Sequence, residues 1–191
     1  MSQVLRPTKG QKLNIEKKLN EGNPLSKVLV GLGWTAPKGA KHNYDLDASL
    51  LTISNSGERV LCYYGEQSIL EGTVQSNGDN QSGEGEGDDE QITIDLENLP
   101  SDIKKMVVFV NIHNGDSNNQ TFGQVSDAFI RLEDNVNGKE LGRFDLDLDA
   151  CDGTGVVFAT LLKSSSGSWV IQFDQEELNV NNATQIVTKY R

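Results

Sequence analysis

A glycine-spaced acidic run is the part of this chain whose residue types and spacing could do chemistry. It extends from Gly78 to Glu90 and carries six carboxylates among four glycines. Between Val60 and Ile103 the chain has eleven acidic residues and no Lys, Arg or His, while the other 17 acidic residues balance its 17 Lys and Arg. The formal net charge of −11 therefore arises in this one segment. Carboxylates alternating with glycine carbonyls are oxygen donors of the kind that calcium prefers.

Two interpretations of the acidic run compete, a disordered acidic linker and a metal-binding loop. Composition alone suits the first. Position favours the second, because the run separates two predicted strands of one domain, and long loops inside compact domains are usually functional when they are ordered. Six neighbouring carboxylates repel one another unless a cation lies among them. Glycine can adopt the positive φ that turns carbonyl oxygens toward one centre.

The identity of the metal follows from the donors. The run contains neither His nor Cys, which disfavours zinc and iron. Its irregular set of oxygens favours calcium over magnesium, which requires a smaller and more regular octahedron. The run is not an EF-hand, because the sixth position of that loop requires glycine and is Glu84 here. We therefore expect a calcium loop of another kind.

Two further acidic segments alternate carboxylates with apolar residues, Asp45-Leu46-Asp47-Ala48-Ser49 and Asp145-Leu146-Asp147-Leu148-Asp149. On a strand, this alternation places the acids on one face. The first segment opens a strand soon after Gly31-Leu32-Gly33-Trp34, so we expect Asp45 and Asp47 to meet the acidic run in space. We interpret the second segment as a solvated strand face.

The elements that must position these residues are β-strands. Nine short runs rich in β-branched and aromatic residues are bounded by Gly, Asn, Asp and Pro. Because no long helical pattern accompanies them, the sequence predicts an all-β sandwich of two mainly antiparallel sheets with a few short helices. The predicted strands are Lys27–Trp34, Leu46–Ile53, Glu58–Tyr64, Gln91–Leu96, Met106–His113, Ala128–Glu133, Glu140–Asp147, Val156–Leu162 and Ser168–Phe173.

Short helices and the two chain ends complete the structural prediction. One helical turn is expected at 100–105, and another at 126–128 or 175–178. A strand is expected around Leu13 and Ile15. Residues 186–188 are expected to form an edge strand or a loosely packed tail.

Length and composition favour one cytoplasmic domain spanning residues 1–191. A chain of 191 residues with 36% hydrophobic residues can bury one core. No stretch resembles a secretory signal or reaches the ~18 apolar residues of a membrane helix. Cys62 and Cys151 match no metal or redox spacing, so we expect reduced thiols. The acidic balance disfavours direct nucleic-acid binding, and we expect a monomer or a weak oligomer.

No catalytic arrangement is visible in the sequence. The chain has two histidines, and no GxSxG, GxxxxGK[ST] or strand-linked GxGxxG occurs. We interpret His113 as a structural histidine and His42 as an exposed one. The glycines at 83, 85 and 87 superficially resemble a phosphate cradle, but the acids among them would repel an anion. The sequence predicts that the protein is not an enzyme.

Several motifs occur in a recognisable order along the chain. They are Gly31-Leu32-Gly33-Trp34, Asp45-Leu46-Asp47-Ala48-Ser49, the acidic run, Ile112-His113, Gln120-Thr121-Phe122-Gly123-Gln124-Val125, and Ala128-Phe129-Ile130-Arg131 followed by Arg143-Phe144-Asp145-Leu146. Together they resemble the signatures of the TerD family of tellurite-resistance and general stress proteins. The resemblance runs from about Leu5 to Leu162, and the glycine-rich ending usual in the family is absent beyond Trp169.

The resemblance implies a calcium-binding β-sandwich and a set of ligands. The implied ligands are Asp45, Asp47, Asp79, Asn80, Gly83, Gly85, Gly87, Asp88, Asp89 and Glu90, with Gly83 and Gly85 acting through their carbonyls. Glu84 and Glu86 fall at variable positions and are expected to be solvated. The first Asp-rich segment and the acidic run together offer eight carboxylates, enough for two adjacent Ca²⁺ ions, and we hypothesise two.

The function that the resemblance implies is a non-enzymatic scaffold or sensor in stress response or tellurite resistance. In it, calcium orders the acidic run, and other stress or tellurite-resistance proteins are the expected partners. One alternative is a small-molecule or cyclic-nucleotide-binding module. A second alternative is a metal-assisted hydrolase, in which a bound ion activates water.

Overall fold

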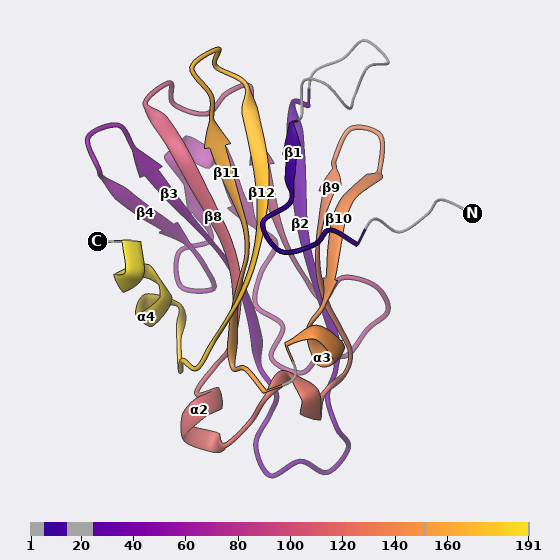
Figure 1. Cartoon of the computed structure of the whole chain (residues 1–191). Helices are drawn as coiled ribbons and strands as arrows, with labels where there is room; N and C mark the ends of the chain where they lie inside the picture. The colour runs from indigo at the N-terminus through magenta and orange to yellow at the C-terminus, as the bar shows by residue number, and fades with distance from the viewer. Residues whose placement is uncertain (1–5, 15–24, 151, 191) are drawn as a thin grey trace.

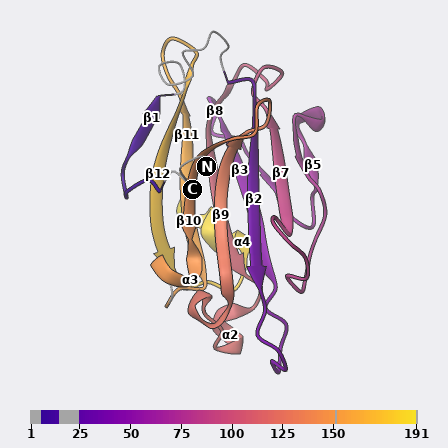
Figure 2. The ribbon, with the colours of Figure 1, turned by 90° about the vertical axis from the view of Figure 1, so that its right-hand side faces the viewer.

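The computed structural model describes residues 6–14, 25–150 and 152–190. Two six-stranded sheets pack face to face, as Figures 1 and 2 show from two sides. The first sheet has the strand order β1-β12-β11-β8-β3-β4, and the second has the order β10-β9-β2-β7-β6-β5. All paired strands are antiparallel. The predicted sandwich of two antiparallel sheets is confirmed.

The nine predicted strands are all present, with ends that differ by a few residues. Two short strands, β5 and β6, were not predicted because each has at most three residues. The strands are β1 Lys12–Asn14, β2 Lys27–Thr35, β3 Leu46–Ser54, β4 Arg59–Cys62, β5 Ser68–Ile69, β6 Val74–Ser76, β7 Glu90–Asp95, β8 Ile103–Ile112, β9 Ser126–Asp134, β10 Lys139–Asp145, β11 Gly155–Lys163 and β12 Trp169–Leu178.

The main core lies between the two sheets. Strand β7 shows the alternation read from the sequence, with buried and half-buried residues in turn. Strands β2, β3 and β8 are buried on both faces and show no such alternation, as expected for the central strands of a covered sheet. The inner faces supply large buried side chains such as Leu32, Leu50, Ile92, Phe158 and Phe173.

A second apolar cluster covers the outer face of the first sheet. Here Leu51, Val107 and Phe109 pack under Ala183 and Ile186 of helix α4, Ala183–Val187. Figure 1 shows α4 beside strands β3, β4 and β8. The prediction of an edge strand or loose tail at 186–188 is therefore wrong. Residues 183–187 form helix α4 instead, and the side chain of Ile186 is fully buried in this cluster.

The other short helices also differ from the sequence prediction. The segments 126–128 and 175–178 lie within strands β9 and β12, and a turn at 101–102 leads directly into β8, so the predictions of helical turns are wrong. In each case, pairing with a neighbouring strand outweighs the weak local helix signal. The short helices are instead η1 Leu70–Gly72, α2 Gly115–Asn118, η2 Phe122–Gln124, α3 Leu146–Asp149 and η3 Thr188–Tyr190.

Two sequence predictions fall partly outside the described residues. Strand β1 contains Leu13, as expected, whereas Ile15 lies outside them. Cys62 is free and buried, and Cys151 lies outside. Within the described ranges, no helix is long and apolar enough to cross a membrane.

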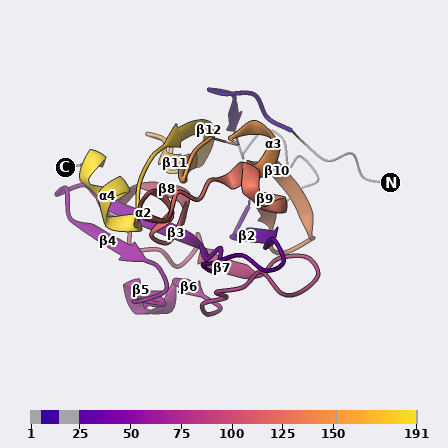
Figure 3. The same ribbon diagram turned by 90° about the horizontal axis from the view of Figure 1, so that it is seen from below.

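One end of the sandwich gathers the loops that matter for chemistry. At this end β2 finishes, β3 begins and β7 begins, since Leu32 of β2 pairs with Glu90 of β7. Figure 3 views the molecule from this end, where α2 and α3 also lie. The acidic run, which connects β6 to β7, is thereby placed next to the start of β3.

Candidate metal centre

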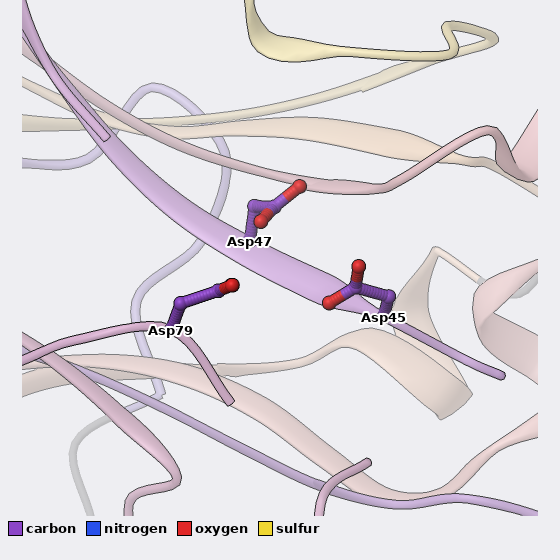
Figure 4. Close-up of side chains that lie close together, drawn as sticks. All are labelled: Asp45, Asp47 and Asp79. Atoms are coloured by element: carbon purple, nitrogen blue, oxygen red, sulfur yellow. The ribbon is translucent and has the colours of Figure 1, made fainter. Parts of the chain in front are cut away.

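Three carboxylates converge at this end of the sandwich. Asp45 precedes β3, Asp47 lies within β3, and Asp79 belongs to the acidic run. Each offers an oxygen, and these oxygens lie within 4.8 Å of one another. Figure 4 shows the three side chains close together, Asp45 and Asp47 at the start of β3 and Asp79 on the neighbouring loop. The predicted meeting of the first Asp-rich segment with the acidic run is thus present in the fold.

The three carboxylates differ in their exposure to water. Asp47 is 2% exposed, Asp45 is half-buried and Asp79 is exposed. Asp45 also has a buried oxygen, Oδ1, with no hydrogen-bond partner. A buried carboxylate oxygen without a donor is costly, and a cation or an ordered water can satisfy it.

The electrostatics of the centre reflect the crowding of negative charge. Burial, together with the charges of Asp45 and Glu90, raises the pKa of Asp47 to about 8. Burial likewise raises the pKa of Glu90 to about 7, against the lowering effect of two backbone hydrogen bonds. The pKa of Asp45 is also raised, by burial and by Asp79. Within the described part of the chain, no Lys or Arg forms an ion pair with any of the three converging carboxylates.

His113 is the basic group recorded nearest to this centre. Its Nδ1 lies 3.8 Å from Asp47 Oδ2, and its ring packs edge-on against Tyr64. Its backbone N–H donates to the Asp45 carbonyl at 2.7 Å. These contacts give His113 a place in the wall of the centre.

Asn80 shapes the beginning of the acidic run. Its Oδ1 accepts hydrogen bonds from the backbone N–H groups of Ser82 and Gly83, both at 3.0 Å, and its Nδ2 donates to Asp89 Oδ1 at 3.2 Å. A side chain at Gly83 would place Cβ 2.4 Å from Nε1 of Trp34, and Gly83 has a φ of +63°. The run therefore folds as a tight turn against the Trp34 ring.

Asp88 is held by an arginine, in contrast to the three converging carboxylates. Arg131 of β9 donates from Nε to Asp88 Oδ1 at 2.8 Å and from Nη2 to Asp88 Oδ2 at 2.7 Å. Only 3% of the Asp88 side chain and 18% of the Arg131 side chain are exposed. Arg131 also pairs with Glu133. The position of Asp88 over the sheet depends on Gly31, where a Cβ would lie 2.4 Å from Asp88 Oδ2.

Asp89 and Glu90 bind backbone groups of the sheets. Asp89 Oδ2 accepts from the Trp34 N–H at 2.9 Å. Glu90 is 4% exposed, and its two oxygens accept from the N–H groups of Ala48 at 2.8 Å and Asn80 at 3.2 Å. Both carboxylates thus fasten the acidic run to β2 and β3.

The ten residues implied as ligands therefore separate into groups by position. Asp45, Asp47 and Asp79 converge, whereas Asn80, Asp88, Asp89 and Glu90 hold the loop through the contacts just described. Gly83 lies against Trp34, Gly85 and Gly87 are exposed with positive φ, and the carbonyl of Gly87 faces Gly33. Glu84 and Glu86 are exposed, as predicted.

Sequence reasoning missed two residues that contact these groups, Arg131 and Asn111. Arg131 holds Asp88, and Asn111 of β8 donates from Nδ2 to Asp47 Oδ2 at 3.1 Å. Arg131 belongs to one of the ordered motifs, which indicated a possible role, but the sequence did not indicate that its partner is Asp88. Asn111 is a polar residue in the apolar part of β8, residues 106–112, which is the signal that could have identified it.

The second acidic segment, 145–149, is not a strand face. Strand β10 ends at Asp145 and α3 follows, so the predicted strand across these residues is wrong beyond that point. Asp145 is buried and pairs with Arg143 and Arg6 rather than being solvated.

The close approach of β2 to the acidic run gives a testable prediction. A Cβ at Gly33 would lie 2.3 Å from the Gly87 carbonyl oxygen, a backbone atom with little freedom to move. We expect Gly33→Ala to lower the free energy of unfolding by about 1–3 kcal/mol, measured by urea denaturation of metal-free protein. Thr35→Ala, at the exposed end of the same strand, should change it by less than about 0.5 kcal/mol. Equal effects of the two substitutions would contradict the packing described.

Comparison with known proteins places the chain in a family. The TerD domain profile matches residues 1–187. The chain is 39% identical over 149 residues to the tellurium resistance protein TerD of Serratia marcescens, covering 76% of this chain and 77% of that protein. It is 35% identical over 197 residues to the stress response protein SCP2 of Bacillus subtilis (strain 168), covering 95% and 96%.

A further relative and a solved structure agree with this placement. General stress protein 16U of Bacillus subtilis (strain 168) is 37% identical over 166 residues, 84% of each chain. The fold matches a crystal structure of a homologue of telluride resistance protein (TerD) from Streptomyces coelicolor A3(2) with a TM-score of 0.72 and 24% identity, covering 82% of this chain and 92% of that one. The chain belongs to the TerD family, whose relatives named here are tellurium resistance and stress proteins.

Proposed function

We propose that the protein binds calcium through Asp45, Asp47 and Asp79 and acts in stress response or tellurium resistance as a non-enzymatic scaffold or sensor. The observation that carries this proposal is the convergence of three carboxylate oxygens within 4.8 Å, one of them on a side chain that is 2% exposed. Such an arrangement of like charges is unfavourable by itself. A divalent cation among the oxygens converts that repulsion into affinity.

The donor set suits calcium in kind. All three converging groups offer carboxylate oxygens. Calcium accepts six to eight oxygens in irregular geometry, which a strand and a loop can supply together with water. Asp45 Oδ1, which has no hydrogen-bond partner among the described residues, gives such an ion a buried oxygen ligand.

We propose one ion at this centre, although the eight carboxylates counted in the sequence led us to hypothesise two. Asp88 is engaged by Arg131, while Glu84 and Glu86 are exposed. Among the described residues, the converging acids form one cluster. The proposal of one ion rests on this single cluster.

The ion would act by joining the acidic run to the sheet. Asp79 belongs to the run, whereas Asp45 and Asp47 belong to the start of β3. A cation held by all three fixes the run in place and orders the exposed segment around Glu84 and Glu86. We propose that this ordered, strongly acidic surface is what other stress or tellurium-resistance proteins recognise.

Calcium-dependent thermal stability tests this proposal. At a calcium concentration about 100 times Kd, one site adds about 2.7 kcal/mol to the free energy of unfolding. For a chain of this size the melting temperature should rise by roughly 5 to 10 °C. The measurement is a melting curve of chelator-stripped protein with and without millimolar calcium, with magnesium as a parallel sample that should give a smaller rise.

Matched variants make the test specific to the centre. The double variant Asp45→Asn/Asp79→Asn should lose the calcium-dependent rise. Glu84→Gln/Glu86→Gln removes the same formal charge from exposed positions of the acidic run and should retain it. The proposal fails if wild-type protein shows no rise, or if both double variants behave alike.

A further inference from the structure

A buried asparagine lies directly behind the candidate metal centre. Asn111 of β8 is fully buried and is the cross-strand partner of Asp47. Its Nδ2 donates to Asp47 Oδ2 at 3.1 Å. The strand around it is apolar, with Val107, Phe109 and Val110 all fully buried. A polar side chain at this position therefore serves something other than packing.

The carbonyl oxygen of the Asn111 side chain has no hydrogen-bond partner among the described residues. The same holds for Oγ of the fully buried Ser49, two residues along β3 from Asp47. Residues two apart on a strand share a face, so both orphan oxygens lie on the Asp47 side of the sheet. An unpaired buried acceptor is costly. Asn111 carries this cost at Oδ1 while its Nδ2 makes one hydrogen bond, to Asp47.

Water is excluded from this region by the C-terminal part of the chain. Gly155 of β11 is the partner of Asn111 on its other side. A Cβ at Gly155 would lie 2.6 Å from Val180 Cγ2 and 3.5 Å from Ile186 Cδ1. The amide thus lies between β3, β11 and the segment that leads to α4, and the side-chain hydrogen bond recorded for it within the described residues is the one to Asp47.

We infer that Asn111 is a positioning residue of the metal centre. Its amide holds Oδ2 of the Asp47 carboxylate, so that this buried ligand presents itself to the ion in one orientation. The inference rests on the proposed function, because it assigns a role toward an ion bound by Asp45, Asp47 and Asp79. Partners that orient metal ligands from behind typically change metal affinity 10–100-fold when they are replaced.

The experiment compares calcium affinity with the stability of metal-free protein. Asn111→Leu removes both the donor and the orphan acceptor while keeping a similar volume, and it should weaken calcium binding 10–100-fold by calorimetric titration. Asn111→Ser places a hydroxyl donor near Asp47 and should recover part of that loss. Thr52→Val, a buried polar-to-apolar change further along β3, should leave the affinity within about twofold.

The outcomes separate this inference from the proposed function. If wild-type protein binds no calcium, the proposed function itself is overturned. If wild-type protein binds and Asn111→Leu binds equally well, only the role of Asn111 is overturned. The same conclusion follows if Asn111→Leu weakens binding no more than Thr52→Val does, or if the serine gives no recovery. If neither Asn111 variant folds, Asn111 is a structural residue and the inference is wrong.

Discussion

At pH 8, the metal-free Asp47→Asn variant is expected to be more stable than metal-free wild-type protein, by up to about 5 kcal/mol in the free energy of unfolding. The reason is the position of the carboxylate. Burial and the charges of Asp45 and Glu90 raise the pKa of Asp47 from 3.8 to about 8. Folding therefore disfavours the ionised form, which the neutral amide of asparagine does not have.

The direction of the pH dependence follows from the same shift. Because the pKa of Asp47 is higher in the folded protein than in the unfolded chain, the folded state binds more protons between these two values. Its contribution to stability is complete below about pH 4 and is lost as the pH rises to about 8. Asp45, Asp79, Glu90, His113 and Tyr64 face this carboxylate. Urea denaturation from pH 5 to 9 should show a flatter profile for the variant than for wild type.

Asp145→Asn is the matched control for this prediction. Asp145 is also buried, but hydrogen bonds from Arg143 and Arg6 outweigh its burial and lower its pKa. Its ionised form therefore stabilises the fold, and the substitution should destabilise the protein at pH 8. If both substitutions destabilise metal-free protein at that pH, the repulsion assigned to Asp47 is absent.

Calcium should reverse the sign of the Asp47 effect. The ligand must be ionised to bind the cation, so binding near pH 7 releases protons. The pKa of about 8 for Asp47 in the metal-free protein places this release in the pH range just below 8. Within that window the calcium affinity of wild-type protein should rise with pH, whereas Asp47→Asn, though more stable without metal, should not gain from calcium.

The sequence was sufficient to predict the sheets and the region of the site. Strand signals are local, because they depend on residues that are adjacent in the sequence. The apolar alternation in 91–96 corresponds to the alternation of buried and half-buried residues in β7. The convergence of Asp45 and Asp47 with the acidic run was also predicted correctly, because one segment opens a strand and the other closes a loop. The predictions of helical turns at 126–128 and 175–178 were wrong, because pairing with the neighbouring strands determines the structure of these segments.

The different roles of the individual carboxylates could not be predicted from the sequence. Asp79 and Asp88 look alike in the acidic run, yet one faces other acids and the other faces an arginine 43 residues away. Asn111 is 64 residues from Asp47. Only the register of β3, β8 and β9 determines these encounters, and no residue pattern within the run records it.

The second large effect is expected from the ion pair that closes the acidic run. Asp88→Ala should lower the free energy of unfolding by about 3–5 kcal/mol, because it leaves the guanidinium of Arg131 partly buried without its two-hydrogen-bond partner. The loss should appear in metal-free protein, which distinguishes a structural clamp from a metal ligand. A ligand facing other acids would instead behave like Asp47, whose neutralisation stabilises the metal-free fold.

A double-mutant cycle of Asp88→Ala and Arg131→Ala isolates the pair from the loss of packing. The matched control is the pair of Lys27 and Asp95, which joins β2 and β7 at 3.7 Å and is considerably more exposed, with 52% and 24% of the side chains accessible. Its coupling energy should be about 0–1 kcal/mol. Similar coupling energies for the two pairs would contradict the structural role assigned to the Asp88–Arg131 ion pair. A large coupling energy confined to Asp88 and Arg131 would mean that a protein cation fastens the acidic run at its C-terminal end. Calcium would then be needed only near Asp79, which has no Lys or Arg partner among the described residues.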